Sequence, residues 1–139
     1  MTSSASRLDQ RVYIEDTDAG GIVYHARYLH YMERGRTEWL RERGFDQQRL
    51  FERNIALVVR TLSCRYRKPA RLDDLLTVVT CANAPKRYTV TFEQQVLYEN
   101  KLLLSGAVDI ACIDATGYKP AQWPEELLAA MINDSRDAQ

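Results

Sequence analysis

Residues 16–40, DTDAGGIVYHARYLHYMERGRTEWL, join an acidic, glycine-containing loop to a segment with helical periodicity. Apolar and small residues recur there every three or four positions, which predicts a helix over residues 28–43 that ends at Gly44. Gly35 inside this helix costs up to about 1 kcal/mol relative to Ala, so we expect the helix backbone to pack closely against a sheet. Arg34 and Glu38 are spaced for an ion pair on the helix surface. One stripe of this helix carries Leu29, Met32, Arg36 and Leu40, and the next carries Tyr28, Gly35 and Trp39.

The rest of the chain is predicted to be mostly strand. The pattern favours strands at residues 10–16, 56–68, 75–84, 87–99 and 102–114, a turn at Asn100-Lys101, and short helices at 46–52 and 124–132. Residues 87–99 alternate most clearly, with Val90, Phe92 and Val96 on one face. Strands grouped after one long helix indicate an α+β fold with an antiparallel sheet, and not alternating α/β units.

The composition narrows the class of protein. The 139 residues suit one domain, residues 1–139, and the formal net charge is zero, so charge gives no reason to expect a nucleic-acid or membrane partner. Cys64, Cys81 and Cys112 are far apart in sequence and odd in number, which favours buried free thiols. No apolar run is long enough for a membrane helix and the first ten residues lack a secretion signal, so we expect a cytoplasmic protein.

Several known site patterns are absent from the sequence. The acidic loop opens like a calcium loop, but Gly20 stands at its fifth position and Arg27 at its twelfth, where a ligand is needed. Asp16, Asp18, His25 and His30 match no zinc-ligand spacing, so no metal is expected. The nucleotide-binding and serine-hydrolase motifs are missing as well. We therefore expect no cofactor.

A carboxylate beside a glycine loop that leads into a helix can support one kind of chemistry. The first amides of a helix have no internal partners and lie at its positive end, so they can bind an oxyanion that forms during a reaction. A nearby Asp18 can direct water or attack a carbonyl itself. The alternative interpretation is structural: Asp18 caps the helix, and Gly20 and Gly21 only make a tight turn.

The spacing of about ten residues resembles the 4-hydroxybenzoyl-CoA thioesterase family. These are Arg11-Val12, Thr17-Asp18, Gly21-Ile22-Val23-Tyr24 and Arg27-Tyr28. Residues 16–40, and later YRKPARLDDLLTV at 66–78, are most similar to its Tol-Pal-associated acyl-CoA thioesterase branch. The resemblance covers about residues 10–132 and implies a hotdog fold, an antiparallel sheet wrapped around one long helix. It also implies a homodimer or homotetramer, with active sites at the dimer interface.

The resemblance implies roles for residues in the loop. Asp18 falls at the catalytic aspartate, the backbone amide of His25 at the group that polarises the thioester carbonyl, and Tyr24 at an aromatic or His position. Gly20 and Gly21 would let the chain turn closely around the substrate. The 4-hydroxybenzoyl enzyme has Trp-Tyr-Pro where this chain has residues 24–26, which argues against the same aromatic acyl group. Glu15 and Asp16 are interpreted as strand-end or solvent residues, and His30 as a packing or surface residue.

The expected activity is hydrolysis of an acyl-CoA to a free acid and CoA. Substrates carried by acyl carrier protein, or aromatic acyl-CoAs, remain alternatives, as does a non-catalytic interaction module for envelope or lipid-synthesis proteins. Six basic residues and no acidic residue lie between residues 53 and 72, and Lys86 and Arg87 follow. CoA carries three phosphate groups, so we expect some of these side chains, Lys86 and Arg87 foremost, to contact them.

Overall fold

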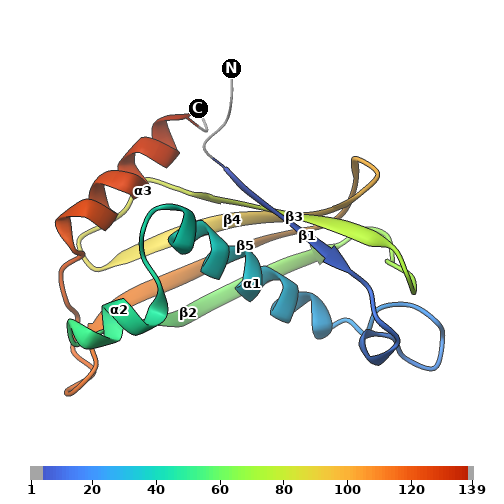
Figure 1. Cartoon of the computed structure of the whole chain (residues 1–139), viewed down its shortest axis with the longest axis horizontal. Coiled ribbons are helices and arrows are strands. Elements are labelled where there is room, and N and C mark those ends of the chain that lie inside the picture. The colour runs from blue at the N-terminus through green and yellow to red at the C-terminus, as the bar shows by residue number, and fades with distance from the viewer. Residues whose placement is uncertain (1–4, 138–139) are drawn as a thin grey trace.

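The computed structural model describes residues 5–137, and residues 1–4 and 138–139 of the predicted domain lie outside the described part. Five antiparallel strands form one curved sheet in the order β1-β3-β4-β5-β2, and α1 lies across its concave face (Figure 1). The α+β prediction is confirmed. The elements are β1 (Ser6–Arg11), the 3₁₀ helix η1 (Ile14–Asp16), α1 (Arg27–Glu42), α2 (Gln47–Glu52), β2 (Ile55–Tyr66), β3 (Leu75–Ala82), β4 (Thr89–Tyr98), β5 (Lys101–Asp114) and α3 (Glu125–Asp137).

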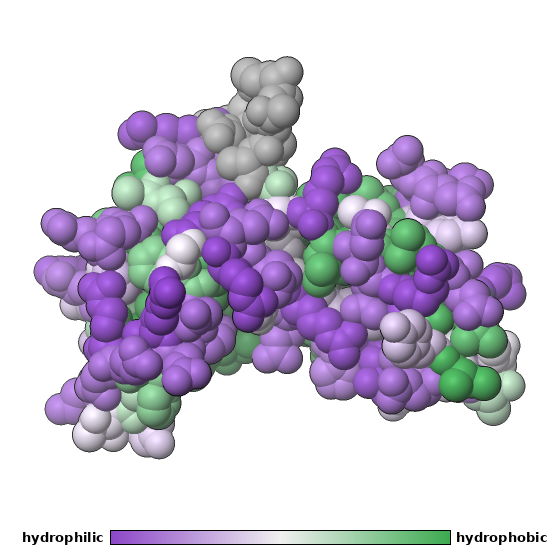
Figure 2. Space-filling model, viewed as in Figure 1, coloured by the Kyte–Doolittle hydropathy of each residue, from purple (hydrophilic) through white to green (hydrophobic). Residues whose placement is uncertain are grey.

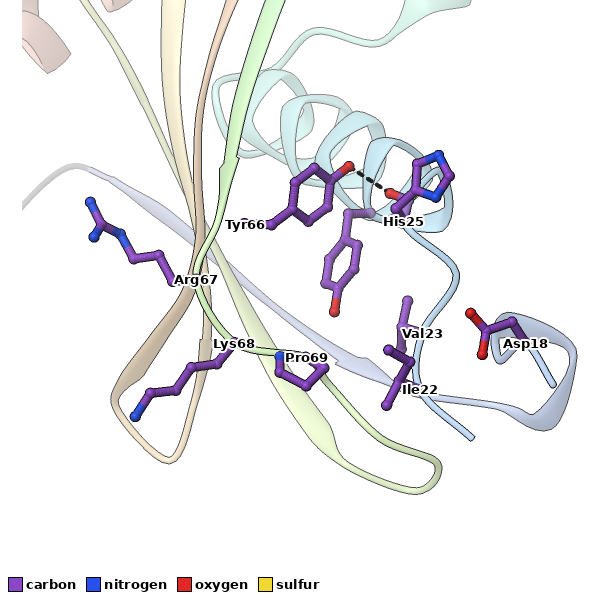
Figure 3. Close-up of a pocket in the computed structure, with 9 residues that line it drawn as sticks. Asp18, Ile22, Val23, His25, Tyr66, Arg67, Lys68 and Pro69 are labelled. Atoms are coloured by element: carbon purple, nitrogen blue, oxygen red, sulfur yellow. Dashed lines mark hydrogen bonds between the residues drawn. The ribbon is translucent and has the colours of Figure 1, made fainter. Parts of the chain in front are cut away.

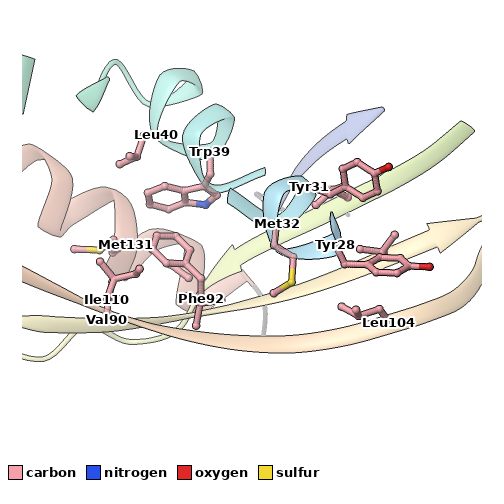
Figure 4. Packing of buried hydrophobic residues seen from close by; sticks show 14 of the residues in the cluster. Tyr28, Tyr31, Met32, Trp39, Leu40, Val90, Phe92, Leu104, Ile110 and Met131 are labelled. Carbon is pink, nitrogen blue, oxygen red and sulfur yellow. The ribbon is translucent and has the colours of Figure 1, made fainter. Parts of the chain in front are cut away.

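The core lies between α1 and the sheet. Tyr31, Met32 and Trp39 of α1 are fully buried, and they face buried side chains of the strands, among them Val90 and Phe92 (Figure 4). The Trp39 and Phe92 rings meet edge to face, with 5.0 Å between their centroids. Along β4, buried residues alternate with more exposed ones, and the buried set includes Val90, Phe92 and Val96. This confirms the predicted inward face, and it fixes the register of the sheet against the helix.

The predicted close approach of α1 to the sheet is confirmed at Gly35. A Cβ atom there would lie 2.7 Å from Thr80 Oγ1 and 2.8 Å from Val78 Cγ1, closer than real Cβ contacts allow. Gly44 has a φ of +86° and ends α1 as predicted, with its amide bonded to the Arg41 carbonyl. The predicted Arg34–Glu38 ion pair is wrong, because Arg34 donates to Gln10 Oε1 on β1 and Glu38 pairs with Arg41.

The two ends of the chain differ from the prediction. The first strand is Ser6–Arg11 and not residues 10–16, because pairing with β3 ends at Arg11 and the chain then turns into η1. The last helix continues to Asp137, five residues beyond the predicted end. Its Asp134 is buried and accepts hydrogen bonds from Trp39 Nε1 and from the Ala82 amide, so a polar residue holds this helix against the core.

Three further features bear on the class of protein: the cysteines, the length of the helices and the grouping of possible metal ligands. Cys64, Cys81 and Cys112 are free thiols, as predicted, although only Cys112 is fully buried. In residues 5–137 no helix has the length and apolar character needed to cross a membrane. Within the same residues no group of three or more His, Cys, Asp or Glu side chains is arranged to hold a metal ion.

Candidate active site

The acidic loop forms a tight hairpin. The Asp18 amide donates to the Ile22 carbonyl over 2.9 Å, and the Gly21 amide donates to the Asp18 carbonyl over 3.0 Å. Gly21 has a φ of +79°, in the left-handed region that a residue with a Cβ atom rarely adopts, so the turn requires this glycine. Asp18 Oδ1 accepts the Gly20 amide at 2.8 Å, and the Asp18 side chain is exposed. The hairpin therefore presents a carboxylate that is already oriented.

Asp16 joins this hairpin to the start of α1. Its side chain is buried, accepts the Tyr13 amide at 2.9 Å and forms an ion pair with Arg27, the first residue of α1, at 3.2 Å. Its backbone carbonyl accepts the Tyr24 amide. The interpretation of Asp16 as a strand-end or solvent residue is wrong, because this carboxylate fixes the loop against the helix. Glu15 is exposed.

His25 lies in the turn immediately before α1, two residues ahead of its first residue. In the described part of the chain no backbone acceptor is bonded to the His25 amide, whereas the Arg27 amide donates to the Tyr24 carbonyl. The His25 carbonyl accepts a hydrogen bond from the Tyr66 hydroxyl at 2.7 Å (Figure 3). A side chain from the end of β2 therefore fixes the peptide that follows His25.

A pocket of about 390 Å³ lies between the hairpin, the start of α1 and the end of β2. We call it the Asp18 pocket. Figure 3 shows Asp18 and His25 on one side of it, with Tyr66 and Pro69 opposite. The lining residues are Asp18, Ile22, Val23, His25, Tyr28, Tyr66, Arg67, Lys68 and Pro69. In the view of Figure 2, hydrophobic residues interrupt the mostly hydrophilic surface at this right-hand end of the molecule.

Tyr28 of α1 lines the Asp18 pocket, and Tyr31 lies nearly one turn further along the same helix. The Tyr28 hydroxyl accepts the Ala70 amide at 3.0 Å, and burial raises the pKa of this tyrosine. Tyr31 is fully buried, and burial followed by the nearby Asp16 carboxylate raises its pKa as well. Its hydroxyl makes no hydrogen bond of good geometry within residues 5–137. Both phenols therefore remain neutral at ordinary pH.

The structure brings together some of the predicted site residues. Asp18 and His25 line the pocket, and Gly20 and Gly21 shape the turn behind Asp18 without lining it. Tyr24 is half-exposed and lies outside the pocket lining. Its ring contacts the His25 ring at a tilt of 51°, with 4.5 Å between the ring centroids.

Lys86 and Arg87 lie away from the Asp18 pocket. They belong to the connection from β3 to β4, where the Lys86 carbonyl accepts Trp123 Nε1. This connection is at the opposite end of the sheet from the Asp18 hairpin (Figure 1). Their contact with CoA phosphates stays a prediction.

Sequence reasoning missed Tyr66 and Pro69 as pocket residues, and it did not place Arg67 and Lys68 beside Asp18. Tyr66, Arg67, Lys68 and Pro69 are far from residues 16–40 in sequence, and only the fold brings them to the hairpin. Two features of the sequence pointed to this part of the chain. They are the six basic residues between residues 53 and 72 and the family-like segment YRKPARLDDLLTV, which begins at Tyr66. Arg67 and Lys68 have no ion-pair partner within residues 5–137, so they place free positive charge beside the pocket.

The fold and the Asp18 pocket agree with the protein family that the sequence matches. The thioesterase-like superfamily matches residues 12–131, and the chain belongs to this family. It is 50% identical to the acyl-CoA thioesterase YbgC of Haemophilus influenzae, over 94% of this chain and 96% of that one. It is 42% identical to the acyl-CoA thioester hydrolase YbgC of Escherichia coli O6:H1, over 93% and 97% of the two chains.

The solved structures agree on the fold. A probable thioesterase of Bartonella henselae superimposes with a TM-score of 0.82 and is 37% identical, covering 86% of this chain and 99% of that one. The hotdog fold implied by the resemblance is confirmed.

Proposed function

We propose that this protein hydrolyses acyl-CoA thioesters to a free acid and CoA, with Asp18 as the catalytic carboxylate. The observation that carries this proposal is that Asp18 and His25 line one pocket and that no backbone acceptor within residues 5–137 is bonded to the His25 amide. The thioester carbonyl oxygen would accept a hydrogen bond from the backbone N–H of His25, which lies just before the positive end of α1. Relatives at 42–50% identity are named acyl-CoA thioesterases, which supports an enzyme over the alternative of a non-catalytic interaction module.

The reaction can proceed by two routes at Asp18. As a general base, the carboxylate takes a proton from water while the water oxygen adds to the carbonyl carbon. The C–S bond then breaks, and the proton passes from Asp18 to the departing sulfur, so CoA leaves as the thiol. As a nucleophile, a carboxylate oxygen adds directly, CoA leaves, and water hydrolyses the resulting anhydride. Single-turnover hydrolysis in ¹⁸O-labelled water distinguishes them, because only the nucleophilic route can leave label in the Asp18 carboxylate.

Asp18→Asn tests the role of this carboxylate. Asn keeps the shape and the hydrogen bond to the Gly20 amide but loses the charge, so turnover of acyl-CoAs should fall about 10²–10⁴-fold. Asp73→Asn is the matched control, since Asp73 is exposed and its left-handed backbone suits Asn. Near wild-type turnover in folded Asp18→Asn protein would refute the assignment.

A homodimer through β2 is the second part of the proposal. Strand β2 is an unpaired edge of the sheet and exposes the apolar side chains of Val58, Val59, Leu62 and Tyr66. An open apolar edge favours pairing with another strand. Tyr66 belongs both to this edge and to the Asp18 pocket, so a monomer would leave the pocket open to water. We expect Leu62→Lys to give a monomer in sedimentation with little activity, and a fully active monomer would contradict this.

The basic residues near the pocket would bind the CoA phosphates. Arg67 and Lys68 line the Asp18 pocket, and Lys86 and Arg87 could reach it only from a second copy. Salt screens exposed charges over about 8 Å at physiological ionic strength, so KM for acyl-CoA should rise with salt. An acyl-pantetheine, which lacks the nucleotide, should respond little. Replacing either basic pair with Ala should raise KM only for acyl-CoA, and equal effects on both substrates would exclude a role in binding the nucleotide.

Three expectations from the sequence stay predictions. They are the use of substrates on acyl carrier protein or of aromatic acyl-CoAs, the association with the Tol-Pal system, and the cytoplasmic location. Comparing kcat/KM for one acyl group on CoA and on acyl carrier protein would decide the first.

A further inference from the structure

A second, more enclosed pocket of about 70 Å³ lies on the helix-covered side of the sheet, near the start of β2. We call it the Arg36 pocket. It lies between α1, α2 and the strands β2, β4 and β5. Leu40, Leu57 and Phe92 make up part of its apolar wall. Its polar groups come from Glu33, Arg36 and Thr37 of α1 and from Gln47 of α2. A cavity of this size has room for a few non-hydrogen atoms.

Arg36 is the unusual member of this pocket. Its side chain is half-buried, and one guanidinium nitrogen donates to Gln94 Oε1 at 2.9 Å. No carboxylate within residues 5–137 forms an ion pair with it, and burial lowers its pKa, partly offset by the charge of Glu33. A guanidinium has five N–H donors and no acceptor, so donors remain available for a bound oxygen.

The position of the two pockets becomes informative if β2 pairs with a second copy of itself. The Asp18 pocket includes Tyr66, the last residue of β2, whereas the Arg36 pocket includes Leu57 and Val59 near its start. Both pockets are on the side covered by α1. When two copies pair through the same edge strand, a two-fold axis relates them and the interface is isologous. If this axis is perpendicular to the sheet, the two β2 strands are antiparallel, and the α1 helices of both copies lie on the same face of the joined sheet.

Such pairing brings the two different pockets together. In residues 58–66 every residue except Cys64 is exposed, and Leu62 is the middle of this open run. Arg60 is an unpaired bulge residue of β2, so a two-fold axis near Leu62 sets Tyr66 of one copy opposite Leu57 of the other. The Asp18 pocket of one copy then adjoins the Arg36 pocket of the other copy, across the shared edge.

We propose that the acyl group of the thioester crosses this edge and that Arg36 of the second copy binds an oxygen acceptor at the far end of the acyl group. This inference rests on the proposed thioesterase function and the β2 dimer. It assigns the preferred substrates to acyl groups that end in a hydroxyl or a carboxylate. A site built to donate hydrogen bonds discriminates strongly against an analogue that lacks the acceptor.

A series of acyl-CoAs of increasing length tests the proposal. Each length is supplied as the plain chain, the ω-hydroxy form and the ω-carboxy form, and kcat/KM is measured for each. At one length the wild-type enzyme should prefer an oxygen-terminated form about tenfold or more over the plain chain. The two oxygen-terminated forms show whether a neutral or an anionic acceptor is bound. Absence of a preference at every length would overturn the proposal, while loss of plain-chain turnover in Asp18→Asn still tests the thioesterase function separately.

Substitution of Arg36 tests which residue gives the preference. In Arg36→Met the ratio of kcat/KM for oxygen-terminated and plain chains should fall to near one, and Arg36→Lys should keep part of it. Arg34→Met is the matched control, because Arg34 is on the same helix, bonds to Gln10 and lines neither pocket. If Arg36→Met does not fold, Thr37→Leu narrows the Arg36 pocket and should raise KM for the longer chains. An unchanged ratio in Arg36→Met, or an unchanged KM in Thr37→Leu, would contradict the proposal.

Mixed dimers test whether Arg36 acts from the other copy. One chain carries Asp18→Asn with Arg36 intact, and the other carries Arg36→Met with Asp18 intact, with separate tags for purification. The only active site then faces an intact Arg36 of its neighbour, so the preference for oxygen-terminated chains should return. If it does not return, Arg36 acts within its own chain and the crossing arrangement is wrong.

Discussion

The Tyr66 hydroxyl donates a 2.7 Å hydrogen bond to the backbone carbonyl of His25 and so connects the end of β2 to the turn before α1. The peptide held in this way follows the amide that we propose as the donor to the thioester carbonyl. A donor of this kind contributes most when it is already oriented before the reaction. Tyr66 is therefore a positioning residue, and it links the edge strand to the reacting atoms.

Tyr66→Phe should lower kcat about five- to tenfold and leave KM nearly unchanged, because one hydrogen bond of ordinary strength is lost and the aromatic wall remains. Steady-state kinetics on one acyl-CoA measure this. Tyr118→Phe is the control, since Tyr118 is highly exposed and lies outside the pocket. A rise in KM at constant kcat would show that Tyr66 binds substrate and does not orient the peptide.

The two adjacent glycines should separate stability from activity. Gly21→Ala forces a left-handed residue and should lower the free energy of unfolding by about 1 kcal/mol, although its Cβ would meet no atom within 4 Å. Gly20→Ala would place a Cβ 3.2 Å from Asp18 Oδ1, so it should displace the carboxylate and lower kcat several-fold with little loss of stability. Denaturant unfolding and kinetics on both variants check this, and the reverse pattern would contradict the roles assigned to the turn.

Asp16→Asn should lower the free energy of unfolding by about 2 kcal/mol, because it weakens the pair with Arg27 and the bond from the Tyr13 amide. The Arg27 side chain is 29% exposed, which keeps the loss below that of a fully buried pair. Glu15→Gln, at the exposed neighbouring position, should change stability little. Equal effects of the two substitutions would show that the buried carboxylate does not fix the loop.

Cys112 should make stability fall at alkaline pH. Burial raises the pKa of this thiol from 9.0 to about 11, so the folded state keeps the proton that the unfolded chain releases. Its contribution to stability is complete below pH 9 and is lost as the pH rises toward 11. The fall in unfolding free energy between these pH values should be smaller in Cys112→Ala than in wild type. Equal slopes would show that Cys112 does not cause it.

The pattern of apolar residues determined the elements of the fold, because periodicity reports which face of a helix or strand is buried. It gave α1 to within one residue, its close approach at Gly35, its end at Gly44 and the inward face of β4. The resemblance carried by residues 16–40 pointed to the family and to Asp18. The apolar pattern did not predict β1 correctly, because Ser6–Arg11 alternates poorly and is held in place by pairing with β3.

Only the tertiary structure decided which residues share the site. Tyr66 meets His25, and Asp16 becomes a buried partner of Arg27, through contacts that no local spacing encodes. Asp134 likewise extends α3 past its predicted end because distant groups, Trp39 and Ala82, bond to it. The sequence by itself determined the buried faces and the reactive loop, since both depend on near neighbours along the chain. The sheet order determined the rest, because it sets the open edge β2 beside the start of α1.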